Sequence, residues 1–449
     1  MMRLMSSVRL LLLLGLMGAC VGPLPIPDPG RIWVVPILAV LAGAGLLVDR
    51  RLPARIWAAA AAVLGLLALY AANPSHRWAD GIGLLPIDHW TVLPAAAFRA
   101  GAWQVMTLAT GLLAAYALAF RLSARQRQAL LVIATAGAVA MAIGVWIQRL
   151  EPRRHPIYEL TGVFVNENHF AVFANLLLPG VLALASRARF RAVQSGSLSS
   201  PAGLFWLSGV LLAGAVVLSR SRAGVAVMAL LVLLHVWRCR RLVRQFPFMD
   251  TPAAARWRGL GWLAVAGAAA LALATLTREW RSTGDLVREG HFRLGMARDT
   301  LHMWRDQPTW GIGPGSFTTV FPYYQSDLFR GRTILHAHSE PVQTLSEYGW
   351  AGVLWLAGFV GLALSARPRG NPPSANGAAE IPAFADLERS ALAAGLLALV
   401  LHSLIDFPLR IPLITMIAAT WAGLWAASRP REGAGIPGDA EPSTGGPST

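Results

Sequence analysis

Titratable side chains gather in one short stretch of this chain, ILHAHSEPVQTLSEYGWAG at residues 334–352. Histidine titrates near neutral pH, so either His336 or His338 is chemically able to take a proton from a hydroxyl group. Glu340 and Glu347 are the other acid–base candidates here. The next residues, VLWLAGFVGLALSA, are almost purely apolar. This stretch therefore predicts proton chemistry at the end of a hydrophobic helix.

Two arginines, Arg220 and Arg222, lie in the sequence LSRSRAG between two apolar segments. An arginine at bilayer depth costs about 2.5–3.5 kcal/mol on insertion scales, so one that is kept there usually faces a polar site. Its planar guanidinium suits two-point binding of phosphate oxygens. The alternative is that both side chains reach outward to the lipid headgroups.

Polar residues also open another apolar segment, in TGVFVNENHFAVFANLLLPG at residues 161–180. Asn166 or Asn168 alone would be explained as a helix N-cap. A single cap does not need four polar residues in a row, so a role in lining a substrate site stays open. A helix N-terminus would in addition favour an anion.

A third polar group, Asp406 and Arg410, lies in LHSLIDFPLR at residues 401–410. The two side chains either contact substrate or form an ion pair that holds this helix end together. If the helix ends named so far meet on one face, His338 and these groups form a single site.

The composition predicts how these residues are held. The chain has 449 residues, of which 55% are hydrophobic and 14% charged, whereas soluble domains carry about 25% charged residues. Apolar runs of roughly 17–25 residues, long enough to cross a bilayer, recur along most of its length. We therefore expect an all-α, polytopic transmembrane helical bundle.

About twelve spans are expected. They lie near 8–22, 32–48, 54–72, 100–120, 128–148, 168–186, 203–219, 222–237, 259–277, 341–366, 389–405 and 411–427. All 39 basic residues are arginine, and alternate connections are rich in them. The positive-inside rule makes those connections, and with them both termini, cytoplasmic. The first segment resembles a signal sequence, but we favour a retained first helix.

The same charge pattern argues against other classes of protein. The net charge of +16 comes from short arginine clusters between apolar segments, so nucleic-acid binding is not expected. Cys20 and Cys239 lie far apart and predict neither a disulfide framework nor a metal site. Residues 429–449, rich in Gly, Pro and Ser, are expected to be a disordered cytoplasmic tail.

The loops on the other, periplasmic face include one larger loop at residues 278–340. Residues 291–306 place Leu294, Ala297, Leu301 and Trp304 at helical spacing and predict an amphipathic helix on the membrane or against the bundle. GIGPGSF at residues 311–317 lacks the lysine of a phosphate-binding P-loop, so we interpret it as a tight turn.

These motifs, in this order, resemble those of one family. The His338–Ser339 pair followed by Gly349 and Gly352 is similar to the histidine signature of the O-antigen ligase and Wzy-type polymerase superfamily. DQPTWGIGPGSF, TGVFVNENHFA, SRSRAG and HSLIDFPL also resemble family segments. The resemblance covers roughly residues 160–415, and one residue departs from it, since family members often have Asn where this chain has Ser339.

The resemblance implies a GT-C-like fold and a metal-independent, inverting glycosyltransferase of the bacterial inner membrane that needs no cofactor. Such an enzyme takes a glycan from an undecaprenyl-pyrophosphate donor at the periplasmic face. It joins that glycan to a hydroxyl of a lipid A core or of a growing chain. In family terms Arg222, and with it Arg293, would hold the pyrophosphate, and His338 would orient or deprotonate the acceptor hydroxyl. Ligase and polymerase both remain open.

The domain expectation follows from this coverage. Residues 1–150 form N-terminal transmembrane helices, and residues 151–428 form an O-antigen ligase-like membrane domain. Two other classes of function also fit many apolar helices. One is a transporter or flippase of lipid-linked sugars, which would place polar groups at mid-membrane and on both faces. The other is a non-catalytic envelope scaffold, for which His338 and Arg222 would be dispensable.

Overall fold

The computed structural model describes residues 2–20, 52–150, 164, 166–197, 199–245, 283–366 and 382–428. These residues are mostly helical, which confirms the expected helical class. The expected spans at 32–48 and 259–277 and the tail at 429–449 lie outside them.

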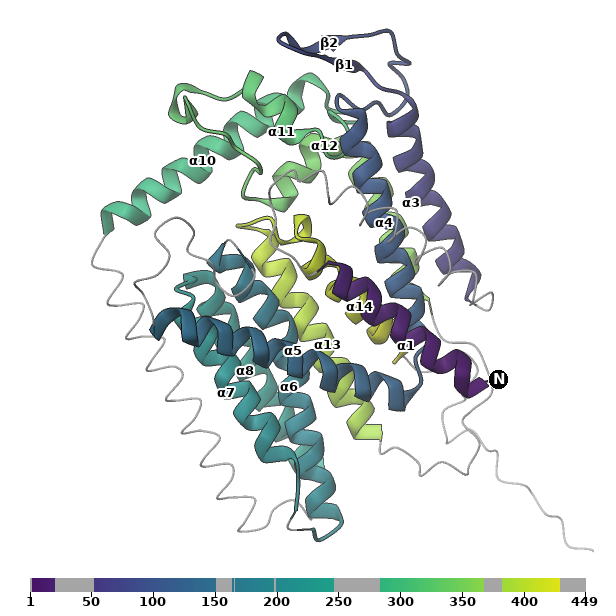
Figure 1. Cartoon of the computed structure of the whole chain (residues 1–449), viewed down its shortest axis with the longest axis vertical. Helices are drawn as coiled ribbons and strands as arrows, with labels where there is room; N and C mark the ends of the chain where they lie inside the picture. The colour runs from purple at the N-terminus through teal and green to yellow at the C-terminus, as the bar shows by residue number, and fades with distance from the viewer. Residues whose placement is uncertain are drawn as a thin grey trace, which may run out of the picture.

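The helices follow one another along the chain (Figure 1). They are α1 (Met2–Ala19), α3 (Ala54–Ala72), α4 (Arg99–Phe120), α5 (Ala124–Leu150), α6 (Glu167–Gln194), α7 (Ala202–Leu218), α8 (Arg222–Gln245), α10 (Thr283–Asp306), α11 (Phe317–Val320), α12 (Glu340–Ser365), α13 (Pro382–Ser403) and α14 (Pro412–Ala427). Short 3-10 helices are η3 (Phe321–Tyr323), η4 (Asp327–Phe329) and η5 (Pro408–Arg410).

Six of the described helices, α3, α4, α5, α6, α8 and α12, are long and apolar enough to cross a membrane. Residues 8–18 of α1 and the whole of α7 and α14 are shorter apolar helices. The protein is thus a multi-pass membrane protein, and the expected number of about twelve spans is not confirmed.

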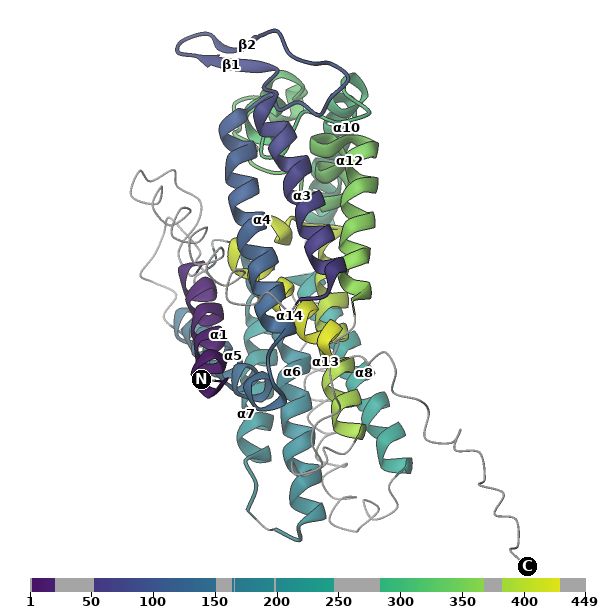
Figure 2. The ribbon, with the colours of Figure 1, turned by 90° about the vertical axis from the view of Figure 1, so that its right-hand side faces the viewer.

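The helices form two groups, one in the upper part of both views and the other in the lower part (Figures 1 and 2). One group packs α3 between α4 and α12, and the other packs α6 against α7, α8 and α13. Helix α14 joins them, because it packs against both α4 and α13. Helix α5 lies across α6 and α7 rather than alongside them.

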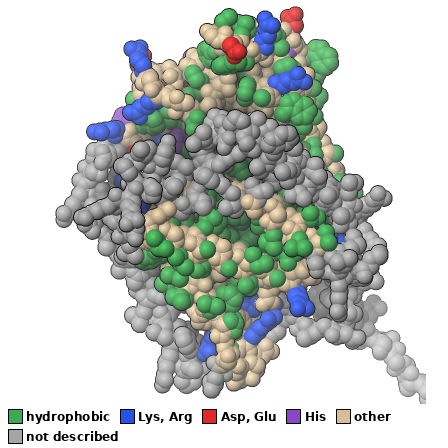
Figure 3. Space-filling view, viewed as in Figure 1, with side chains coloured by type: hydrophobic (Ala, Val, Ile, Leu, Met, Phe, Trp, Pro, Cys, Tyr) green, Lys and Arg blue, Asp and Glu red, His purple; other side chains and the backbone are tan. Residues whose placement is uncertain are grey.

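Helix α6 is the centre of the core. Every residue from 169 to 187 is buried, including Phe170, Leu176 and Leu182, and all three belong to the largest apolar cluster. The outer helices instead expose large apolar side chains, such as Leu204 on α7 (65% exposed) and Leu354 on α12 (65%). In Figure 3, apolar side chains cover the middle of the described surface and basic ones lie toward its ends.

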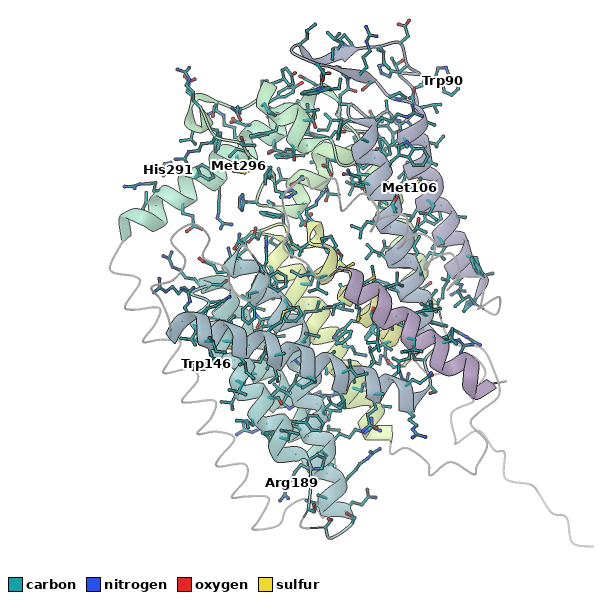
Figure 4. The ribbon with its side chains drawn as sticks, viewed as in Figure 1. Trp90, Met106, Trp146, Arg189, His291 and Met296 are labelled. Atoms are coloured by element: carbon teal, nitrogen blue, oxygen red, sulfur yellow. The ribbon has the colours of Figure 1, made fainter. Side chains whose placement is uncertain are left out.

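The two ends of the molecule differ in character. Figure 4 places Arg189, in the last turns of α6, near one end and Trp90 near the other. The Trp90 end carries a short antiparallel hairpin of β1 (His76–Ala79) and β2 (Gly83–Pro86), which the sequence analysis did not predict. Helices α10 and α11 lie at this same end (Figure 1).

Helix α10 confirms the amphipathic helix but corrects its extent and its buried face. It begins at Thr283, and its buried residues include Met296 and Met303, which pack with Phe321. Leu294, which we expected on the apolar face, is 70% exposed. The face of α10 that packs inside the protein is therefore the one with Met296 and Met303, against Phe321 and Phe329 of the segment that follows the helix.

Glycine bends the chain at two places that matter for the site. Gly349 interrupts α12 with φ 62° and ψ 179°, and a Cβ there would collide with the backbone of Thr309. The helix restarts at Trp350, whose N–H donates to the carbonyl of Pro308 at 3.0 Å. Gly313, with φ 92°, lies against the backbone of Ala96 and confirms a tight turn in GIGPGSF.

Candidate active site

Three histidine rings surround Phe407, which follows α13. His336 packs over it with ring centroids 4.3 Å apart, and His169 and His338 meet it edge-on at 4.7 and 4.9 Å. His336 and His338 come from the segment before α12, and His169 comes from the first turn of α6. Segments far apart in the sequence therefore meet at one aromatic ring, which the sequence analysis had not singled out.

His338 lies beside a buried carboxylate. Its Nδ1 atom is 3.3 Å from Oδ1 of Asp406, and the side chains are 30% and 2% exposed. Two hydrogen bonds fix the backbone of Asp406: the N–H of Glu340 donates to its carbonyl, and its own N–H donates to the carbonyl of His402. Its carboxylate accepts from the N–H of Phe407 at 3.0 Å. Nδ1 of the partly exposed His338 ring thus faces the buried carboxylate of Asp406.

His338 is held in an uncommon backbone conformation. Its φ is 51°, in the left-handed region, which a residue with a side chain seldom adopts. Such strain costs on the order of 1–3 kcal/mol and persists only where the surroundings enforce it. Here the enforcing contacts include the hydrogen bond from the N–H of Glu340 to Asp406.

The charge state of Asp406 suits an orienting role. Burial alone would raise the pKa of Asp406, but the contact with His338, the charges of His169 and His338, and the N–H of Phe407 together lower it. Asp406 is therefore ionised at neutral pH, and its Oδ1 atom faces Nδ1 of His338 at 3.3 Å. A carboxylate in this position favours the imidazole tautomer that carries its hydrogen on Nδ1. The Nε2 atom is then the nitrogen left to accept a proton.

His336, by contrast, is a neutral packing residue. Burial is the main cause that lowers its pKa to about 3, and the charge of Arg410 adds to the effect. The amide of Gln343 lies 3.4 Å from its Nδ1 atom. Between the two histidines of the HAH stretch, the geometry therefore favours His338 for proton transfer.

Arg410 is enclosed by two carboxylates of α12. Its Nε donates to Glu340 at 3.2 Å, and its Nη1 donates to Glu347 at 2.5 Å. Burial opposes the charge of Arg410, but the carboxylates of Glu347 and Glu340 outweigh it and raise the pKa of Arg410 above its ordinary value. The expected alternative of an Asp406–Arg410 pair is wrong, because each residue has a different partner.

The carboxylates of Glu340 and Glu347 also accept hydrogen bonds from backbone N–H groups. Glu340 accepts from the N–H of Leu409 at 2.7 Å, and Glu347 accepts from the N–H of Phe317 at 3.3 Å. They join α12 to η5 and α11. This use explains their presence without an acid–base role, and the geometry of Arg410 supports a structural role rather than substrate contact.

The asparagines at the start of α6 have separate roles. Asn166 is the N-cap, and its side chain accepts from the N–H of Asn168 at 2.8 Å. The side chain of Asn168 accepts a hydrogen bond of 2.6 Å from the buried hydroxyl of Ser221. Asn166 thus begins the helix, whereas Asn168 joins α6 to the turn between α7 and α8.

That turn, residues 219–222, is referred to below as the arginine turn. Arg220 is exposed and has φ 66°, and Arg222 is the first residue of α8 and partly exposed. The Ser221 hydroxyl also accepts from the N–H of Gly224 at 3.1 Å, so it caps the start of α8. Arg222 is therefore carried on a helix start that is fixed to α6.

Arg293 reaches from α10 to the turn after α13 that contains Asp406. Its Nη1 donates to the carbonyl of Ile405, next to Asp406, and its Nε and Nη2 donate to Glu289. Two N–H groups of its guanidinium are not used by these bonds. Of the residues selected from the sequence, His338 and Asp406 are in contact, and Arg293 reaches the carbonyl of Ile405 beside Asp406. Arg410 pairs with Glu340 and Glu347 instead.

A comparison with known protein families tests the resemblance that the motifs indicated. Residues 207–357 match the family model described as O-antigen ligase. Over these residues the chain is similar to O-antigen ligases. The resemblance inferred from the motifs is thereby confirmed. No curated protein matches the chain.

The O-antigen ligase match runs from within α7 to within α12. It contains Arg222, Arg293 and His338, whereas Asn168 and Asp406 lie on either side of it. The contacts of Asn168 with Ser221, and of Asp406 with His338, join residues outside the matched segment to residues within it.

Proposed function

We propose that this protein transfers a glycan from an undecaprenyl-pyrophosphate donor to an acceptor hydroxyl at the periplasmic face of the bacterial inner membrane. Membership of the O-antigen ligase family implies a glycosyl-transfer enzyme. One observation supports the site above all others: a partly exposed histidine, His338, lies against the buried carboxylate of Asp406.

In this mechanism His338 is the general base. Its Nε2 takes the proton of the acceptor hydroxyl while the hydroxyl oxygen attacks the anomeric carbon of the donor sugar. Asp406 holds the Nδ1–H and stabilises the imidazolium that forms, as an orienting carboxylate does in other base-assisted reactions. Asp406, first considered as a substrate ligand, is therefore proposed as a positioning residue.

Arginine side chains act on the leaving group. As the new bond forms, the bond from the anomeric carbon to the pyrophosphate oxygen breaks, and its electron pair leaves on the lipid pyrophosphate. Arg222 and the free N–H groups of Arg293 would neutralise that charge, and Arg220 and Asn168 would border the donor. Attack opposite the leaving group inverts the anomeric configuration.

A transfer assay with the purified protein in nanodiscs tests the proposal. The substrates are an undecaprenyl-pyrophosphate-linked glycan and either a lipid A core or a shorter glycan chain. We expect His338→Ala to lower turnover by on the order of 100-fold or more, and Arg222→Gln to lower it by on the order of 100-fold. Wild-type turnover in both variants would refute the assigned site.

The acceptor distinguishes a ligase from a polymerase. Surface glycans of a deletion strain provide the comparison: accumulation of free lipid-linked chains indicates a ligase, and loss of long chains with core capped by single units indicates a polymerase. Movement of substrate across vesicles without a new glycosidic bond would instead support a flippase.

A further inference from the structure

An asparagine and a histidine form a polar contact deep inside the helical core. Asn175, in the middle of α6, is fully buried, and His402, at the end of α13, is 1% exposed. The amide nitrogen of Asn175 donates to the carbonyl of Gly224 at 2.8 Å and lies 3.2 Å from Nε2 of His402. Three helices, α6, α8 and α13, are joined at this one side chain.

Stability alone does not account for these residues. Apart from Asn175, residues 170–185 of α6 are Ala, Val, Phe, Leu, Pro and Gly. A buried amide that lacks part of its hydrogen bonding costs about 1–3 kcal/mol, and Oδ1 of Asn175 has no partner among the described residues. An apolar side chain would pack here at lower cost, so the contact must serve a specific geometry.

Each end of the contact leads to a part of the proposed site. Gly224 lies two residues after Arg222, so the first bond fixes the arginine turn. The backbone carbonyl of His402 accepts from the N–H of Asp406 at 3.0 Å. The contact between Asn175 and the His402 side chain therefore fixes the turn that presents the Asp406 carboxylate to His338. Helix α6 thus links the arginine side of the site to the base side.

The contact also defines the hydrogen on His402. An amide nitrogen has two protons and no lone pair available to accept, so Asn175 donates in both bonds. Nε2 of His402 is then the acceptor, and a neutral His402 carries its proton on Nδ1. If His402 were protonated, its Nε2–H would face the N–H of the Asn175 amide, and the contact would break.

We propose that Asn175 and His402 are positioning residues that set the spacing between the arginine turn and the His338–Asp406 pair. The proposal rests on the proposed function for its kinetic readout. In a displacement, the base and the groups that hold the leaving group act on opposite sides of one carbon. A misplacement of about 1 Å between them is enough to cost on the order of 100-fold in rate.

The experiment compares Asn175→Leu, His402→Leu and His402→Gln in the full-length protein in nanodiscs. The two leucine variants should lower kcat by on the order of 10- to 100-fold, with little change in the KM for the donor. Gln supplies an acceptor oxygen in place of Nε2, so His402→Gln should recover most of the activity. The acidic limb of the rate–pH profile should shift in the leucine variants and return in His402→Gln.

Matched controls lie at the other end of the same helix. Ser186 of α6 contacts His235 of α8 at 3.0 Å, and both are buried. Ser186→Ala and His235→Leu should keep the wild-type kcat and pH profile, although they remove a buried polar contact between helices. Their thermal unfolding provides the reference for destabilisation without a kinetic effect.

The outcomes separate the two proposals. A wild-type protein that transfers no glycan refutes the proposed function, and wild-type turnover in both His338→Ala and Arg222→Gln refutes the assigned site. An inactive His338→Ala variant together with a fully active His402→Leu variant refutes the positioning role alone. If Asn175→Leu does not fold, equal activity of His402→Leu and His402→Gln still refutes it.

Discussion

The Nδ1 atom of His338 lies 3.3 Å from Oδ1 of Asp406, although the two residues belong to segments separated by α12 and α13. The histidine has a left-handed backbone, and the carboxylate is buried and charged. This relationship turns a set of separate motifs into one site with testable consequences.

Asp406→Asn should reduce transfer by on the order of 100-fold, because an amide is able to turn its NH2 group toward Nδ1 and favour the wrong imidazole tautomer. Steady-state turnover in nanodiscs measures the loss. Asp327→Asn is the control, since Asp327 lies on an exposed turn and pairs with Arg330. Equal turnover of Asp406→Asn and wild type would remove Asp406 from the mechanism.

Arg410→Met should destabilise the fold by about 3–5 kcal/mol, because it leaves Glu340 and Glu347 buried without their shared partner. Chemical unfolding followed by tryptophan fluorescence measures the change. The exposed pair Arg330–Asp327 serves as control, and Arg330→Met should alter stability by less than about 1 kcal/mol. A similar small effect at Arg410 would contradict the role of this ion cluster.

Gly349→Ala should prevent α12 from bending, because alanine resists a φ of 62° and its Cβ would meet the backbone of Thr309. We expect a strong loss of folded protein, measured as the monodisperse fraction after size exclusion. Gly358→Ala, in the straight part of the same helix with no atom near its Cβ position, should fold normally. Normal folding of both variants would show that the bend is dispensable.

Stability should fall in mild acid through His336. Its pKa is about 6.5 unfolded and about 3 folded, so between these values only the unfolded chain binds the proton. This contribution is complete above pH 6.5 and decreases by about 1.4 kcal/mol for each pH unit below it, down to about pH 3. Unfolding midpoints across pH 4–8 measure the slope.

His336→Gln should flatten that dependence, whereas His291→Gln, which changes an exposed histidine of α10, should leave it intact. An unchanged slope in His336→Gln would mean that other groups cause the loss of stability in acid.

Local patterns predicted much of this protein. Apolar runs located most of the described helices, and the polar residues at helix ends led to His338, Asp406 and Arg222 as candidate site residues. Gly349 was selected only through the resemblance to a family signature, and its role as the bend of α12 comes from the structure. These features depend on residues that are neighbours in sequence or on the conformation of a single residue.

The remaining contacts depend on which helices meet. The sequence paired Asp406 with Arg410 because they are one helical turn apart, but α12 brings Glu340 and Glu347 closer to Arg410. Leu294 was expected on the apolar face of α10, but the residues of α10 that pack against Phe321 are Met296 and Met303. The contact between Asn175 and His402 was not predicted, because the two residues lie on helices that are far apart in the sequence.

The burial of α6 on every side limits which substitutions this helix accepts. A helix that faces lipid on one side accepts apolar residues of many sizes there, but α6 has no such side between residues 169 and 187. Variation in this helix is limited by shape on every side, as in the interior of a water-soluble protein. Substitutions meant to change the substrates of the proposed transfer are therefore expected to be tolerated more readily on the loops around α10 than on α6.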